Sequence, residues 1–295
     1  MISGRTGVFV LFGSPVEHSL SPAIHNTSFA ELGLDYVYLC HDVAPAAIGA
    51  AVEGARAMGF AGFNVTMPCK AAVIEHLDEL SPAARLMGAV NTVKREGDRL
   101  IGHNTDGAGL LRSVTERGFN VAGADITVIG AGGAGSAVYT QAALDGAGKI
   151  SVFKRANSSF EASSKKIAAL SEHTGVNLTL ADVADEATLK RAVHEADIVV
   201  DATRVGMAPL ENQSNIEEEW LRPGQAVVDT VYHPRKTKLL ELAARAGATP
   251  IDGLGMLLWQ AAIAEEIWLN VAMPVDRVRE AVFGKSAYIE KSTSR

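Results

Sequence analysis

The chain reads Ile126-Thr127-Val128-Ile129-Gly130-Ala131-Gly132-Gly133-Ala134-Gly135 near its middle. The short apolar run predicts a buried strand, and the small residues of 136–147 that follow it predict a helix. A glycine-rich turn between a strand and a helix is the context in which this pattern indicates a dinucleotide site. Gly130 would permit the tight turn, Gly132 a close approach to a pyrophosphate, and Gly135 close helix packing. The alternative is a glycine-rich turn that binds no ligand.

Apolar runs on both sides of this turn repeat the alternation of strand and helix. After the turn they predict strands at 150–153, 177–180, 198–202 and 226–229; before it, strands at 7–12, 36–43 and 60–67, with a first helix that Ser21 caps ahead of Pro22. The alternation predicts an α/β protein, with an N-terminal mostly parallel α/β substrate domain and a doubly wound Rossmann dinucleotide-binding domain.

Two helices near the C-terminus, at 256–271 and 275–283, are expected to return to the first domain. The substrate-binding and catalytic domain is then discontinuous, formed by residues 1–106 with 254–295. Residues 107–253, entered through a helix near 107–117, form the dinucleotide-binding domain. The polar tail after Phe283 is expected to fray.

Composition favours a cytoplasmic enzyme that acts on a small molecule. The 295 residues carry 34 acidic and 27 basic side chains, a net charge of −7, without long runs of like charge, which argues against nucleic-acid and anionic-membrane surfaces. Two cysteines cannot build a disulfide framework. No apolar stretch approaches the roughly 18 residues of a membrane span. The eight histidines lack zinc-site spacing, so we predict no metal.

Lys70 and Asp106 are candidates for an acid/base pair. Both fall at the ends of segments in the predicted sheet domain, near the uncharged hydrogen-bonding residues Thr66, Asn91 and Thr105. Oxidation of a secondary alcohol needs removal of a proton from oxygen, and a lysine with a lowered pKa can accept it. A neighbouring carboxylate would couple to the lysine, so the sequence leaves open which one is the kinetic base. Alternatively the lysine is a solvated charge and the aspartate a helix cap.

Ser19 and Ser21 lie just beyond the first strand. Two hydroxyl groups at a helix start can hold a substrate carboxylate together with the N–H groups of the helix. The alternative is that they are turn and cap residues. Gln260 lies among apolar neighbours on the helix after Gly255, which favours a buried amide that seeks a partner.

Five segments together resemble the shikimate dehydrogenase family, and the match runs along nearly the whole chain. They are Ser19-Leu20-Ser21-Pro22, Asn64-Val65-Thr66-Met67-Pro68-Cys69-Lys70, Gly88-Ala89-Val90-Asn91-Thr92, Asn104-Thr105-Asp106-Gly107 and Gly255-Met256-Leu257-Leu258-Trp259-Gln260-Ala261-Ala262. The segments that begin at Asp201 and Val231 resemble the quinate/shikimate dehydrogenase branch. The resemblance implies reversible oxidation of the ring C3 hydroxyl of shikimate or quinate to the 3-dehydro ketone, with NAD or NADP as hydride acceptor.

The resemblance also implies roles for single residues. Lys70 and Asp106 match the family's catalytic lysine and aspartate, and Ser19 and Ser21 the serines that bind the substrate carboxylate. The family residues that contact the ring hydroxyls of the substrate correspond to Thr66, Asn91, Thr105 and Gln260. Tyr38 corresponds to a tyrosine in the substrate pocket of the quinate/shikimate branch. Matches to cofactor contacts are the turn of Gly130, Ala131, Gly132, Gly133, Ala134 and Gly135, the ribose segment with Lys154, Arg155 and Asn157, and, toward the nicotinamide, Arg204, Thr230, Val231, Tyr232, His233 and Gly253.

One departure from the branch concerns the cofactor. In that branch an aspartate, which can accept hydrogen bonds from the ribose hydroxyls of NAD, is common at the position of Asn157. This chain has no carboxylate there, so the choice between NAD and NADP stays open. Three further questions stay open: whether the substrate is quinate or shikimate, whether the protein is a monomer or a homodimer, and whether its role is biosynthetic or catabolic. A family member acting on an aminoshikimate-like or other cyclitol would keep Lys70 and Asp106. A ligand-sensing regulator would be expected to lose that pair or gain a basic segment, and neither is seen.

Overall fold

The computed structural model describes residues 2–284, which divide into two compact units. The first unit contains the chain up to Thr105 together with the chain from Gln260 onward, and the second unit runs from Asp106 to Trp259. The assignment of residues 1–106 with 254–295 to substrate binding and catalysis, and of residues 107–253 to dinucleotide binding, stays a prediction. The expected fraying of the tail concerns residues outside the described part.

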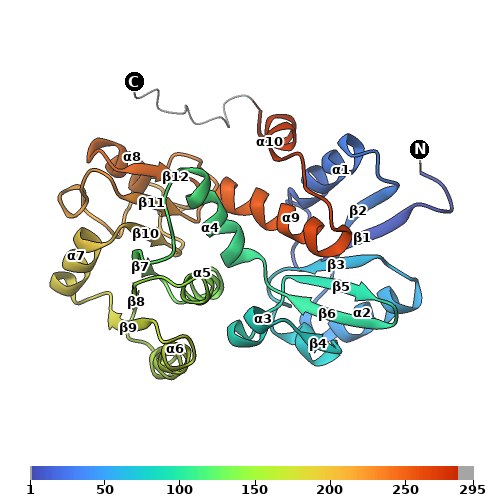
Figure 1. The fold of residues 1–295 in the computed structure, drawn as a ribbon, viewed down its shortest axis with the longest axis horizontal. Coiled ribbons are helices and arrows are strands. Elements are labelled where there is room, and N and C mark those ends of the chain that lie inside the picture. The colour runs from blue at the N-terminus through green and yellow to red at the C-terminus, as the bar shows by residue number, and fades with distance from the viewer. Residues whose placement is uncertain (1, 285–295) are drawn as a thin grey trace. The chain divides into compact units, whose positions relative to one another are not determined.

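The first unit is built on a six-stranded sheet with the strand order β2-β1-β3-β5-β6-β4 (Figure 1). Its strands are β1 (Gly7–Gly13), β2 (Tyr36–Asp42), β3 (Gly62–Val65), β4 (Glu79–Leu80), β5 (Thr92–Glu96) and β6 (Arg99–His103). β1 pairs in parallel with β2 and β3, and β4 with β6, whereas β5 is antiparallel to both of its neighbours. The predicted α/β class is confirmed.

The strand β1 serves two hydrophobic cores, because successive side chains of a strand point to opposite faces. Phe9 and Leu11 pack with α1 (Ser21–Glu31) and with Ala264 and Trp268 of α9 (Gly253–Leu269). On the other face Val10 and Phe12 pack with α2 (Ile48–Ala57). Two further helices of this unit are α3 (Pro82–Met87) and α10 (Val275–Phe283). The sheet is thus covered on both faces.

The hairpin of β5 and β6 was not predicted from the sequence. Its strands are joined by the two-residue loop Gly97-Asp98, in which Gly97 has a positive φ of 62°, as favoured in such tight hairpin turns. Because β5 runs against β3, it begins at the sheet edge where β3 ends, and β6 also ends at that edge. The hairpin therefore brings Asn91, before β5, and Thr105, after β6, to one edge.

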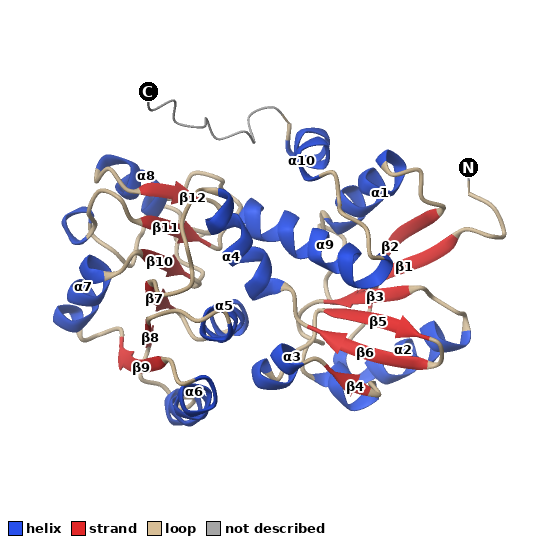
Figure 2. Cartoon of the chain, in the orientation of Figure 1, coloured by secondary structure: helices blue, strands red, loops and turns tan. Residues whose placement is uncertain are grey.

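The second unit is a parallel six-stranded sheet with the strand order β12-β11-β10-β7-β8-β9 (Figure 2). Its strands are β7 (Asp125–Ile129), β8 (Lys149–Lys154), β9 (Asn177–Asp182), β10 (Ile198–Asp201), β11 (Ala226–Asp229) and β12 (Thr249–Ile251), and its helices α4 (Asp106–Glu116), α5 (Gly133–Leu144), α6 (Phe160–Thr174), α7 (Glu186–Glu195) and α8 (Lys238–Arg245). The order reverses between β7 and β10, and ligands of doubly wound sheets bind at such a switch point. The Rossmann-type prediction is confirmed; β12 and α8 were not predicted.

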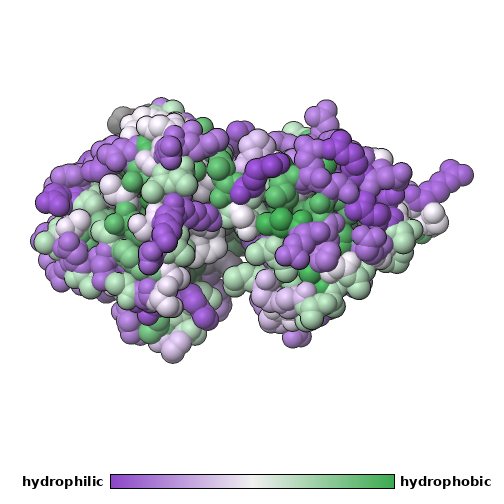
Figure 3. Space-filling model, turned by 90° about the horizontal axis from the view of Figure 1, so that it is seen from below, coloured by the Kyte–Doolittle hydropathy of each residue, from purple (hydrophilic) through white to green (hydrophobic). Residues whose placement is uncertain are grey.

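Hydrophilic and apolar residues are interspersed over the visible face of each unit in Figure 3. The most exposed large apolar side chains, Ile2, Met58 and Met67, come from separate parts of the first unit. Scattered exposed apolar residues are normal on protein surfaces. Between residues 2 and 284, no helix combines the length and the apolar character that crossing a bilayer requires.

Candidate active site

An amide and hydroxyl network lies at the sheet edge that the hairpin completes. Asn91 donates from Nδ2 to Oγ1 of Thr105 (3.0 Å), and its Oδ1 accepts from the Thr105 backbone N–H (2.8 Å) and the Thr92 hydroxyl (2.9 Å). All three side chains are buried. Two of the predicted ring-hydroxyl contacts, Asn91 and Thr105, are therefore brought together and fixed in orientation.

Asn64 extends this network to Tyr38. Nδ2 of Asn64 donates to Oγ1 of Thr92 and to the carbonyl of Asn91 (both 2.9 Å), and Oδ1 accepts from the Tyr38 hydroxyl (2.7 Å). Burial raises the pKa of Tyr38 well above its usual 10, the Cys40 thiol raises it further, and a hydrogen bond with Ser21 opposes both. Tyr38 therefore stays protonated and keeps its donor on Asn64. The predicted pocket tyrosine has no exposed surface.

Ser19 and Ser21 lie together at the start of α1. The Ser19 hydroxyl accepts from the Ser21 backbone N–H (3.2 Å), and Leu20 occupies the N-cap position without a side-chain cap. The expectation that Ser21 caps this helix is therefore wrong, because α1 begins at Ser21 itself and the chain reaches the helix with Leu20 already helical in conformation. The hydrogen bond from the Ser21 N–H to the Ser19 hydroxyl is a turn contact, as the alternative expected, and the role of the pair in binding a carboxylate stays a prediction.

Of the other predicted residues of the first unit, Thr66 and Lys70 lie in the segment after β3, and Gln260 lies on α9. Thr66 follows β3, and its methyl group would clash with any Cβ at Gly13, so the glycine lets Thr66 approach the end of β1. Lys70 is half-buried, and its carbonyl accepts from the Val90 backbone N–H (2.8 Å), one residue before Asn91. Gln260, on α9, is buried. These roles stay predictions.

Asp106 is the first residue of α4 and is 8% exposed. A carboxylate in the first turn of a helix is stabilised by the helix dipole. Asp106 also follows Thr105 directly, so the hydrogen bonds between Thr105 and Asn91 fix the chain from which it projects. Its pairing with Lys70 stays a prediction.

The glycine turn has the geometry that the sequence suggested for it. Gly130 has a φ of 100°, a conformation that side chains rarely adopt, and a Cβ at Gly135 would lie 1.9 Å from the carbonyl oxygen of Gly130. A Cβ at Gly132 or Gly133 would meet no atom within 4 Å. The turn is therefore tight where it packs and open at the N-terminus of α5, where N–H groups can receive a phosphate.

The predicted ribose segment follows β8 and is exposed. Lys154 donates from Nζ to Oδ1 of Asn157 (2.7 Å) and to the Ser159 hydroxyl (2.9 Å), and its ammonium lies 5.7 Å from the centre of the Phe160 ring. Oδ1 of Asn157 also accepts from the backbone N–H and the hydroxyl of Ser159. Asn157 thus holds a cation in place, whereas an aspartate there would supply a negative charge. Arg155 is exposed beside it.

Two buried carboxylates support the loops predicted near the nicotinamide. Asp201 ends β10 and accepts from the Thr203 backbone N–H (2.9 Å) and from Nδ2 of Asn215 (2.8 Å). Its register partner Asp229 ends β11 and accepts from the Val231 backbone N–H (2.9 Å) and the Thr237 hydroxyl (2.6 Å). Burial raises the pKa of both carboxyls, that of Asp229 to about 6, to which the charge of Asp201 contributes.

The remaining predicted cofactor residues lie on these loops. Arg204, Tyr232 and His233 are exposed, and Thr230 and Val231 follow β11 directly. A Cβ at Gly253 would lie 2.4 Å from the carbonyl oxygen of Thr230, so the glycine allows α9 to begin against this loop. Their role toward a nicotinamide stays a prediction.

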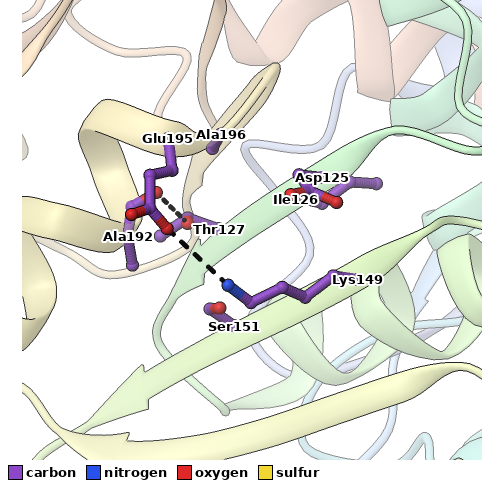
Figure 4. Close-up of a pocket in the computed structure, with 8 residues that line it drawn as sticks. All are labelled: Asp125, Ile126, Thr127, Lys149, Ser151, Ala192, Glu195 and Ala196. Atoms are coloured by element: carbon purple, nitrogen blue, oxygen red, sulfur yellow. Dashed lines mark hydrogen bonds and ion pairs between the residues drawn. The ribbon is translucent and has the colours of Figure 1, made fainter.

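A small hollow lies at the amino-terminal ends of β7 and β8 (Figure 4). Nζ of Lys149 lies 3.8 Å from Oε2 of Glu195 across it, and the Thr127 hydroxyl donates to the Ala192 carbonyl (2.9 Å). Ligands of parallel α/β sheets bind at the opposite, carboxyl ends. The hollow is therefore not where a dinucleotide is expected. Within the described residues no three His, Cys, Asp or Glu side chains form a metal-binding group.

Comparison with known proteins agrees with this geometry. The model of the shikimate dehydrogenase substrate binding domain matches residues 11–93, and that of the shikimate 5'-dehydrogenase C-terminal domain matches residues 253–283. The shikimate dehydrogenase (NADP(+)) of Listeria monocytogenes serotype 4b is 44% identical over 283 residues, which are 96% of this chain and 97% of that protein. The chain belongs to the shikimate dehydrogenase family.

Solved structures of the shikimate dehydrogenase family have the same fold along the whole chain. A crystal structure of shikimate 5-dehydrogenase from Listeria monocytogenes, in complex with shikimate and NAD, is 44% identical, covers 96% of this chain and 98% of that one, and gives a TM-score of 0.93. Quinate dehydrogenase from Corynebacterium glutamicum, in complex with NAD, is 30% identical, covers 94% and 99%, and gives a TM-score of 0.84. The family is one of NAD(P)-dependent oxidoreductases, and the quinate branch is represented among its relatives.

Asn64 and Thr92 were missed as members of the site. Both stand in segments that carry the family resemblance, and a polar residue within an apolar strand could have marked Asn64 as one that needs partners. Their connections to Tyr38 and Asn91 depend on strand pairing that the sequence did not predict.

Proposed function

We propose that the chain is a quinate/shikimate-type dehydrogenase that reversibly oxidises the C3 hydroxyl of shikimate, quinate or both to the 3-dehydro ketone. The observation that carries this proposal is the 44% identity to a shikimate dehydrogenase over nearly the whole length of both proteins. The preorganised network of Asn91 and Thr105 supports it, because oriented donors and acceptors are what a polyhydroxylated ring needs.

Substrate binding is assigned to the edge of the first unit. Ser19 and Ser21 bind the carboxylate with their hydroxyl groups, and the hydrogen bond between the Ser21 N–H and the Ser19 hydroxyl, which keeps the two residues close at the start of α1, supports this assignment. Asn91 and Thr105, with Thr66 and Gln260, bind the ring hydroxyls. Tyr38 supports this set from within the core, since its hydroxyl is engaged by Asn64.

Proton transfer is assigned to Lys70 and Asp106. When bound, the nicotinamide accepts the hydride from C3. Lys70 takes the proton of the C3 hydroxyl in the direction of oxidation and returns it in the direction of reduction. Asp106 orients the ammonium, and the two groups act as a coupled pair.

The glycine turn and the segment after β8 fit a dinucleotide. The open space above Gly132 and Gly133 admits a pyrophosphate at the N-terminus of α5. Lys154 and Arg155 place two cations where the adenosine ribose is expected, and no carboxylate stands at position 157. A 2′-phosphate is favoured by cations and opposed by a carboxylate, so NADP should serve at least as well as NAD. The relative named for NADP(+) supports the same choice.

Steady-state turnover on a grid of shikimate and quinate, each with NAD and NADP, tests the proposal. Activity on at least one of the two acids is expected, with kcat/KM for NADP equal to or above that for NAD. Turnover of neither acid, with turnover of an amino-substituted or other cyclitol, would shift the function to the alternative substrate. A cytoplasmic location and a monomeric or homodimeric state stay predictions.

A further inference from the structure

Three polar side chains in the core of the first unit have no place in the proposed chemistry. Nδ1 of His25, on α1, and Oε1 of Glu265, on α9, share a hydrogen bond of 2.8 Å, and the hydroxyl of Ser28 donates to Oε2 of Glu265 (2.6 Å). All three residues are completely buried. Residues some 240 positions apart in the sequence thus meet in a polar cluster without access to water.

Stability alone gives a weak reason for such a cluster. A buried carboxylate is costly unless it is paired, and replacing a buried ionic pair with apolar residues of similar size is often neutral or stabilising. The Nε2 atom of His25 is buried and has no hydrogen-bond partner in the structure, which adds to the cost. A role in fixing the orientation of neighbouring side chains would account for the His25–Glu265 pair, which the stability of the core does not require.

The cluster is in contact with the residues of the proposed substrate site. The ring of His25 stacks on the ring of Tyr38, with centroids 4.4 Å apart and planes inclined by 18°. Ser21 precedes His25 by one helical turn and is buried on the same side of α1. From Tyr38 the contacts continue to Asn64, whose amide contacts Asn91 and Thr92. A displacement of the His25 ring would therefore reach the hydroxyl-binding network through Tyr38.

We propose that Glu265 is a positioning residue for substrate binding: it fixes the ring of His25, and through that ring it holds Tyr38 in the orientation that the hydrogen bond to Asn64 requires. This inference rests on the proposed function, because it explains how that same pocket is held. Glu265 touches neither substrate nor cofactor in this assignment.

The test compares three variants with the wild type. Glu265→Gln keeps an acceptor for one of the two donors and removes the charge. His25→Leu with Glu265→Leu removes the whole polar pair and the ring stack while filling the core. Ile24→Val is the matched control, because Ile24 is fully buried on the same helix and outside the polar cluster. The measurements are KM for shikimate, KM for NADP, kcat and Tm.

The double variant should keep a Tm at or above that of the wild type, since apolar replacement of a buried pair commonly costs no stability. Its KM for shikimate should rise roughly 3- to 30-fold, which lies within the range of coupling in one hydrogen-bonded network, with kcat and KM for NADP nearly unchanged. Glu265→Gln should show a smaller rise of KM. Ile24→Val should lower Tm by a few degrees and leave KM for shikimate unchanged.

Two results would overturn the proposal. One is a folded double variant with the KM for shikimate of the wild type. The other, which decides the matter if the double variant does not fold, is a Glu265→Gln variant with unchanged KM. A wild type that turns over neither shikimate nor quinate is a different outcome: it rejects the proposed function itself.

Discussion

Replacing Asp229 by asparagine should remove a pH-dependent loss of stability from the second unit. Asp229 is 1% exposed, and both of its oxygens accept hydrogen bonds, from Val231 and from Thr237. Burial and the neighbouring Asp201 together raise its pKa to about 6. Asparagine has nearly the same shape, its Oδ1 can still accept from Val231, and the Thr237 hydroxyl can turn to accept from the new amide.

The sign of the effect follows from the raised pKa. Between about pH 4 and pH 6 the folded protein binds the proton of Asp229 and the unfolded chain does not, so the free energy of unfolding falls as the pH rises through this window. A shift from 3.8 to about 6, at 1.36 kcal/mol per pKa unit, corresponds to about 3 kcal/mol. The amide of the replacement side chain cannot ionise. The stability of Asp229→Asn relative to wild type should therefore increase by up to about 3 kcal/mol from pH 4 to pH 7.

Urea unfolding of both proteins at half-unit steps between pH 4.5 and pH 7.5 measures this difference. Asp185→Asn is the matched control, because Asp185 caps α7 and its hydrogen bonds with Thr188 lower its pKa from the ordinary 3.8. Asp185 therefore ionises below the measured range in both the folded and the unfolded chain, so the stability difference between that variant and the wild type should stay constant from pH 4.5 to pH 7.5. A difference between Asp229→Asn and wild type that does not vary with pH would show that the carboxyl is not held protonated by its surroundings.

Three further predictions concern the proposed reaction. Lys70→Ala should fold normally by circular dichroism and lose roughly 100-fold or more in kcat, and retention of a tenth of the activity would exclude the acid/base role. Ser19→Ala with Ser21→Ala should raise KM for shikimate roughly 10- to 150-fold with little change in kcat, whereas an unchanged KM with a lower Tm would make the serines structural. Asn157→Asp should shift the ratio of kcat/KM for NAD to kcat/KM for NADP toward NAD by around tenfold, equivalent to about 1.4 kcal/mol. A wild type that prefers NAD, with a ratio that the substitution leaves unchanged, would contradict the assignment of this segment to the ribose.

The second unit was largely predictable because its central strands β7, β8, β10 and β11 are buried on both faces. Continuous apolar runs such as Ile126–Ile129 stand out against amphipathic helices, and the glycine turn fixes where the first strand ends. β5 and β6 escaped prediction because Lys94, Arg95 and Arg99 interrupt the apolar pattern of strands that lie toward one side of the sheet. The dipeptide Gly97-Asp98, which is typical of a two-residue hairpin turn, is the only strong indication of this hairpin in the sequence.

The candidate site was predictable residue by residue but not as an arrangement. Asn91 and Thr105 could be chosen from residue type and resemblance, yet their mutual hydrogen bonds depend on the unpredicted hairpin. Glu265 is one of two adjacent carboxylates, with Glu266, on a mostly apolar helix. Its partners on α1 are fixed by tertiary packing, which sequence spacing does not encode over such a separation.

The discontinuity of the first unit sets an order of events during protein synthesis. Phe9 and Trp268 stack with ring centroids 4.4 Å apart, and Trp268 and Ala264 complete the core that includes Phe29 and Tyr38. A ribosome that has made residues 1–105 must still translate the whole second unit before Ala264 and Trp268 emerge, which takes roughly 8 to 30 seconds at elongation rates of about 5 to 20 residues per second. This face of the nascent sheet lacks the α9 part of its core during that interval. The second unit, contiguous in sequence, can fold first, and the earliest part of the chain to be made is among the last to close its core.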